Sequence, residues 1–140
     1  MNKITNIDCS KNSVNIALFI LRVSVAVMML EHGIPKLQML IYGDIQFPSV
    51  IGMNPSISLA MAVFAEVLCS LLLLIGLFTR VAVIPLIITM LAAVFIIHRG
   101  DPFAKQELGI HYLIVYIALF MLGGGKYSFD AIMQSYRTSN

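Results

Sequence analysis

The chain has 140 residues, of which 59% are hydrophobic and only 11% are charged, and its mean hydropathy is +0.92. A soluble globular domain carries roughly 25% charged residues because its surface has to be wetted, so this composition excludes that class. The formal net charge of +2, without a long basic run, argues against a nucleic-acid partner. We therefore expect an integral membrane protein whose exterior contacts lipid.

Four apolar stretches predict an all-α fold. Each is long enough to cross a hydrocarbon core of about 30 Å at about 1.5 Å per residue, and we place them at residues 14–32, 57–78, 81–98 and 107–122. A turn of only two or three residues joins the second stretch to the third, which favours antiparallel neighbours. The predicted fold is an integral membrane four-helix bundle with antiparallel up-down topology, in a membrane domain of residues 14–125.

Polar segments flank this domain. Residues 1–13 form a polar N-terminal tail, and residues 126–140 form a short C-terminal tail with an amphipathic stretch that Ser128 is expected to cap. The first apolar stretch contains an arginine and is not followed by a small-x-small cleavage site. We therefore expect a retained first span and not a signal peptide.

The ends of the first span follow from turn-forming residues. Ser13 is the expected N-cap, and Gly33 and Pro35 are expected to end the helix. The interrupted segment 37–56 is interpreted as an interfacial loop. Four spans put both termini on one side of the cell membrane, and a small excess of Lys and Arg on that side favours the cytoplasm. Cys9 and Cys69 lie in different environments and are expected to be unpaired thiols.

Two charges lie within the predicted spans. Arg22 lies roughly 12 Å along the first helix from its cytoplasmic start, and Glu66 lies roughly 18 Å from the cytoplasmic end of the second. A long arginine side chain covers that difference, so we predict a buried ion pair between Arg22 and Glu66. Such a pair either tunes a cofactor or proton site or acts as a structural clamp that fixes helix register.

A second polar group is expected at the non-cytoplasmic end of the bundle. The ends of the first, third and fourth predicted spans bring together all three histidines with nearby charged residues, namely Glu31, His32, Lys36, His98, Glu107 and His111. Imidazole and carboxylate groups can relay protons or hydrogen-bond the carbonyls of a quinone head group. Tyr112 and Tyr116 are aromatic residues that can line such a site. The spacing matches no strong metal motif, so no metal and no intrinsic cofactor are expected, and a site for a quinone head group or for proton relay is favoured over a metal site.

Four motifs together resemble the DoxX family of small four-helix membrane proteins. They are LRVSVAVMMLEHGIPK at 21–36, AEVLCSLLLLIGLFTR at 65–80, HRGDPF at 98–103 and GGGKYSFD at 123–130. The resemblance implies a multi-pass cell-membrane protein. It also implies association with thiosulfate:quinone oxidoreductases or terminal quinol oxidases, or an accessory role, with Arg22 and Glu66 at the family's intramembrane charged positions.

Three functional hypotheses follow. The first is a quinone-interacting or accessory subunit of a membrane oxidoreductase system, whose partners are membrane lipid, a quinone and another oxidoreductase subunit. The second is a non-enzymatic scaffold that docks a partner protein through the loop 37–56 and the C-terminal tail. The third is a transporter of protons or small molecules, which requires oligomerisation because four short helices hardly enclose a path.

Overall fold

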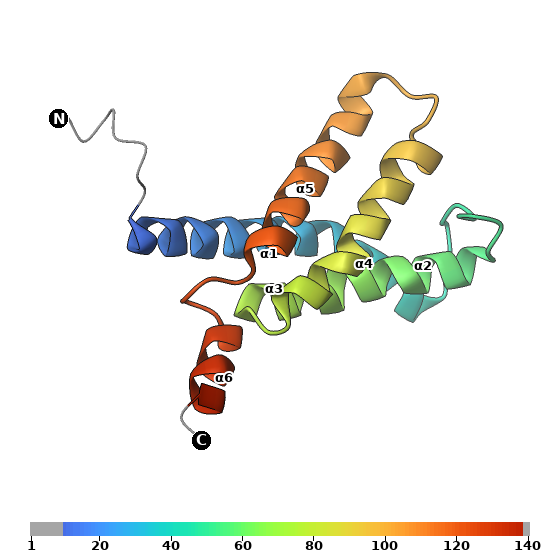
Figure 1. Cartoon of the computed structure of the whole chain (residues 1–140). Helices are drawn as coiled ribbons and strands as arrows, with labels where there is room; N and C mark the ends of the chain where they lie inside the picture. The colour runs from blue at the N-terminus through green and yellow to red at the C-terminus, as the bar shows by residue number, and fades with distance from the viewer. Residues whose placement is uncertain (1–9, 139–140) are drawn as a thin grey trace.

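A computed structural model describes residues 10–138, and over this range the chain is helical with no strand. Figure 1 shows one long helix, α1, that lies along α2 and α3, and a second pair formed by α4 and α5. Four helical stretches are long and apolar enough to cross a membrane: Lys11–Tyr42, Pro55–Ile75, Thr79–Ile97 and Phe103–Leu122. The expectation of an all-α protein with four potential membrane spans is confirmed. Residues 1–9, which include Cys9 and most of the predicted tail, lie outside the described residues.

Helix α1 (Lys11–Tyr42) is longer at both ends than the predicted span 14–32. Its N-cap is Ser10, whose Oγ accepts the amide of Ser13 at 3.1 Å, so the prediction of Ser13 as the cap was wrong. The helix ends at Gly43, whose backbone is in the left-handed conformation and whose amide donates to the carbonyl of Met39. Pro35 lies inside the helix: it lacks only one amide, and the helix continues across that gap. This continuation puts Lys36 on the helix.

The second and third spans each contain a π-helical turn. The second consists of α2 (Pro55–Val63), η1 (Phe64–Cys69) and α3 (Ser70–Ile75), and it ends at the left-handed Gly76. The third consists of α4 (Thr79–Ala92) and η2 (Ala93–Ile97). Single π-helical turns inside α-helices are frequent at functional sites. Both of these turns border the candidate site described below.

The fourth span, α5 (Phe103–Leu122), starts one turn earlier than predicted. A short helix, α6 (Phe129–Thr138), follows a glycine-rich connection. The prediction that Ser128 caps this helix is confirmed, because its Oγ accepts the amide of Ala131 at 3.3 Å. Hydrogen bonds join residues 126–130 to helices on the other side of the predicted boundary at residue 125. The division into a membrane domain and a tail stays a prediction.

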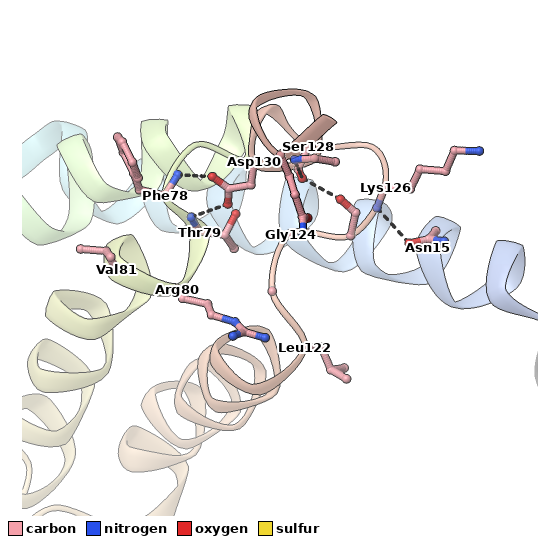
Figure 2. Close-up of a pocket in the computed structure, with 14 residues that line it drawn as sticks. Asn15, Phe78, Thr79, Arg80, Val81, Leu122, Gly124, Lys126, Ser128 and Asp130 are labelled. Atoms are coloured by element: carbon pink, nitrogen blue, oxygen red, sulfur yellow. Dashed lines mark hydrogen bonds between the residues drawn. The ribbon is translucent and has the colours of Figure 1, made fainter. Parts of the chain in front are cut away.

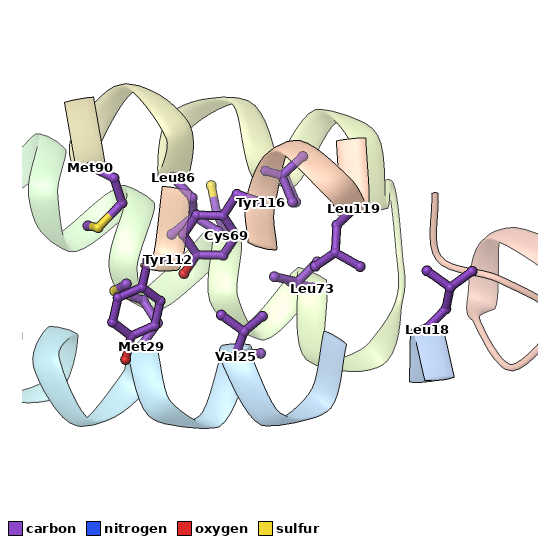
Figure 3. Packing of buried hydrophobic residues seen from close by; sticks show 13 residues of the cluster. Leu18, Val25, Met29, Cys69, Leu73, Leu86, Met90, Tyr112, Tyr116 and Leu119 are labelled. Carbon is purple, nitrogen blue, oxygen red and sulfur yellow. The ribbon is translucent and has the colours of Figure 1, made fainter. Parts of the chain in front are cut away.

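The hydrophobic core lies where all four spans meet (Figure 3). Residues from every span contribute to it, including Val25, Cys69, Leu86 and Tyr116. Cys69 is buried there as a free thiol. Many other large apolar side chains are exposed on the outside of the helices, which suits a lipid environment.

Gly33 is a packing position and not the end of the first helix. A Cβ at this residue would lie 2.9 Å from Val67 Cγ2 and 3.0 Å from the backbone carbonyl atoms of Glu66. The missing side chain therefore lets α1 approach η1 closely. This contact sets the distance between the two helices at the level of Glu66.

We expect Gly33→Ala to lower the free energy of unfolding by about 1–3 kcal/mol, because the added methyl group overpacks the contact between α1 and η1. Gly100→Ala is the matched control, since nothing lies within 4 Å of its Cβ position. Thermal unfolding in detergent compares the two variants. Equal melting temperatures would contradict the assigned close approach.

Candidate ion-pair site between α1, η1 and η2

Arg22 does not pair with Glu66, so the predicted ion pair between these two residues is wrong. The Arg22 side chain is 1% exposed, and its Nη1 donates to the carbonyls of Leu73 and Leu74 at 2.7 Å each. Its Nη2 donates to the carbonyl of Tyr127 at 2.7 Å. Carbonyls in the last turn of a helix lack helical amide partners, and the guanidinium fork is suited to bind them. Arg22 therefore joins α1, α3 and the segment before α6.

Glu66 pairs instead with Lys36. The Lys36 Nζ lies 2.5 Å from Oε1 and 2.7 Å from Oε2 of Glu66. The Glu66 side chain is 3% exposed and that of Lys36 is 28% exposed, so the carboxylate is buried while its partner reaches the edge of the bundle. A helix that ended at Gly33 would leave Lys36 in a loop, which is why the sequence prediction missed this pair. The helical spacing of Met29, His32 and Lys36 carries the signal that could have found it.

Two cavities meet at this ion pair. The smaller, of about 170 Å³, lies between α1, α4 and α5 and is lined by His32, Lys36, Glu66, His98 and Tyr112 among others. The larger, of about 300 Å³, lies under the loop between α1 and α2 and is mostly apolar, with the Phe47 ring 5.7 Å from Lys36 Nζ. Glu66 of η1 and Ala93 of η2 line both cavities. We call the smaller one the polar cavity.

Two tyrosines extend from the polar cavity into the core (Figure 3). Tyr112 lines the cavity, and its ring packs edge-on against His32 with centroids 5.9 Å apart. The Tyr116 ring stacks on the Tyr112 ring, with the two centroids 6.0 Å apart. Both hydroxyls are buried and have no hydrogen-bond partner among residues 10–138. A buried, unpaired hydroxyl costs free energy, so the Tyr112 hydroxyl is suited to donate to a bound acceptor.

His98 is oriented by a carboxylate at the mouth of the polar cavity. Its Nδ1 lies 2.7 Å from Asp101 Oδ2, and Gln106 donates to the His98 carbonyl at 2.8 Å. The hydrogen bond from His98, aided by the charge of Lys105, holds the pKa of the Asp101 carboxyl below its ordinary value. Because the Asp101 carboxylate binds Nδ1 of His98, Nε2 of the same ring can bind a ligand or carry a proton.

Four of the predicted site residues do not line the polar cavity, and one of them is Tyr116, which lies behind Tyr112. Glu31 and Glu107 are exposed. His111 lines a separate apolar cavity between α1 and α5, and its Nδ1 bonds the carbonyl of Glu107. The reason is the face of α5 on which His111 lies: Tyr112, the next residue, lines the polar cavity, whereas His111 is turned by about 100° around the helix axis. Within residues 10–138, no three His, Cys, Asp or Glu side chains group closely enough to hold a metal ion.

Comparison with known proteins gives one match. The family model DoxX matches residues 17–99, which is more than half of the chain. The chain belongs to the DoxX family. No curated protein and no solved structure matches it. The DoxX match contains Arg22, Lys36, Glu66 and His98 but ends before α5, so Tyr112 and the GGGKYSFD motif at 123–130 lie outside it.

Proposed function

We propose that this DoxX family protein is a quinone-binding subunit of a membrane oxidoreductase system, and that the head group binds in the polar cavity. The observation that carries the proposal is the convergence of Lys36, His98 and Tyr112 on one cavity, together with a Tyr112 hydroxyl that has no partner among residues 10–138. Ligand sites combine apolar walls with a few convergent polar groups, and this cavity has both.

The chemistry of the lining suits a ring with two carbonyl oxygens. Tyr112 and His98 can each donate a hydrogen bond to a carbonyl, while Met29 and Met90 supply apolar walls. The Lys36–Glu66 ion pair also lines the cavity, and the Lys36 ammonium group is a third hydrogen-bond donor there. An aliphatic chain offers no acceptor for these donors.

Reduction of a quinone to a quinol takes two electrons and two protons. In this proposal the electrons come from a partner oxidoreductase subunit, and the residues of this chain hold and move protons. His98, with Asp101 behind it, connects the polar cavity to the exposed link between η2 and α5. The four spans then alternate in direction across the cell membrane, with both termini in the cytoplasm.

Binding of a short-chain quinone analogue tests the proposal. We expect Tyr112→Phe to weaken binding about tenfold, because the net contribution of one hydrogen bond is about 1.4 kcal/mol. His111→Ala is the matched control, since His111 is absent from the polar cavity. Isothermal titration of detergent-purified protein measures both affinities. No binding by the unchanged protein, or equal losses in both variants, would refute the proposal.

A further inference from the structure

Helix α6 has an apolar face that no part of residues 10–138 covers. Phe129, Ile132, Met133 and Tyr136 follow the i, i+3, i+4, i+7 spacing of one helix face. All four are exposed, Tyr136 by 72%. The opposite side carries Asp130 and Gln134, which border the start of α4.

Hydrogen bonds fix where α6 begins. The Asp130 carboxylate accepts the amides of Phe78 at 2.7 Å and Thr79 at 2.9 Å, and the Asp130 amide donates to the carbonyl of Gly76 at 3.0 Å (Figure 2). Figure 1 shows α6 running across the direction of α1 beside the end of α3. The start of α6 therefore lies beside the turn at Gly76–Thr79, where the second span ends and the third begins.

A cavity of about 620 Å³ lies between the start of α6, the start of α4 and residues 122–126 (Figure 2). Arg80 and Lys126 line it, and Arg137 lies at an adjoining cavity that shares Phe78 and Asp130. These three cations are exposed, whereas the charge of Asp130 is already bound by two amides. The buried Thr79 hydroxyl also borders the cavity and has no partner among the described residues.

We propose that α6 is an interfacial helix that binds anionic phospholipid. Its apolar face lies at the boundary between head groups and acyl chains, and the adjoining cavity with Arg80, Lys126 and Arg137 receives the lipid phosphate. Amphipathic helices with one apolar face lie in this boundary, and basic residues near a membrane surface attract anionic lipids. Charge complementarity and the continuity of α6 with the spans select lipid as the occupant.

The chain contains no tryptophan, so single-tryptophan variants report on α6 without background. Ile132→Trp and Tyr136→Trp place the reporter on the apolar face, and Ser135→Trp is the control on the polar face. The full chain is reconstituted in vesicles of phosphatidylcholine and phosphatidylglycerol. We expect lipids brominated near the glycerol to quench positions 132 and 136 several-fold more than position 135, and aqueous iodide to show the reverse order.

Equal iodide quenching at all three positions would overturn the proposal. Shielding of positions 132 and 136 from both quenchers would also overturn it, because a second copy of the chain would then cover the face.

A second experiment tests the binding of the lipid phosphate. It uses Lys126→Gln combined with Arg137→Gln, with Lys105→Gln as the matched control. We expect phosphatidylglycerol to raise the melting temperature of the control but not of the double variant. An equal rise in both would refute the phosphate site.

Discussion

Replacing Lys36 with methionine will lower the free energy of unfolding by about 2–3 kcal/mol. The substitution leaves the buried Glu66 carboxylate without its partner, and breaking a fully buried pair costs about 3–5 kcal/mol. The expected loss is smaller here because water reaches the partly exposed Lys36. Thermal unfolding in detergent measures the effect.

A second variant separates charge from packing. Lys36→Met combined with Glu66→Gln removes both charges, so we expect it to regain most of the stability lost by Lys36→Met alone. Lys105→Met is the matched control, because Lys105 lines the same polar cavity but its side chain is 64% exposed. An unchanged melting temperature for Lys36→Met would show that Glu66 is not ionised beside Lys36, and the ion-pair assignment would be wrong.

Replacing Arg22 with methionine will destabilise the fold by about 3–5 kcal/mol, since three carbonyls lose a charged hydrogen-bond donor in a site closed to water. Arg22→Lys will recover only part of this loss, because one ammonium group cannot match the planar fork that serves both α3 and Tyr127. Arg80→Met is the control, as Arg80 is exposed and donates to one carbonyl at 3.1 Å.

Amide hydrogen exchange gives this prediction a local readout. The Arg22 guanidinium holds the end of α3 against the segment before α6, so Arg22→Met should speed exchange at the amides of Gly76 and Asp130. Equal stability of Arg22→Met and Arg80→Met, with unchanged exchange, would contradict the role of Arg22 as the link between these segments.

The segment around Gly76 shows why Arg22 is needed there. A Cβ at Gly76 would lie 2.6 Å from Arg22 Nη1 and 2.6 Å from the Ser128 side chain. Only a glycine, with its left-handed backbone, leaves space for the guanidinium at this turn. The GGGKYSFD motif then supplies the Tyr127 carbonyl and the Asp130 carboxylate. This motif completes the end of the bundle although it lies outside the DoxX match.

Hydropathy predicted the four spans because lipid contact demands long apolar stretches, and the structure contains four such helices. Helix ends were less predictable. Ser10 caps α1 three residues before the expected cap. Pro35 does not end the helix, which loses one backbone hydrogen bond there but packs closely against η1 at Gly33.

The site depended on those helix ends. Arg22 and Glu66 were recognised as the buried charges. The partners of Arg22 are backbone carbonyls far away in the chain, which periodicity does not reveal, and Lys36, the partner of Glu66, was expected in a loop. His32, Lys36, His98 and Tyr112 share the polar cavity as expected of one polar group. His111 does not, because it lies on another face of α5 than the polar cavity, and a prediction made from membrane level alone does not distinguish the faces of a helix.

The central claim is that a quinone head group binds in the polar cavity, and photolabelling tests it most directly. The full chain in vesicles is illuminated with an azidoquinone, and mass spectrometry locates the label. We expect labelling of the peptides that carry His32, Met90–His98 and Tyr112, and we expect unmodified quinone to compete with it. Labelling spread over the lipid-facing residues, or unaffected by the competitor, would contradict it.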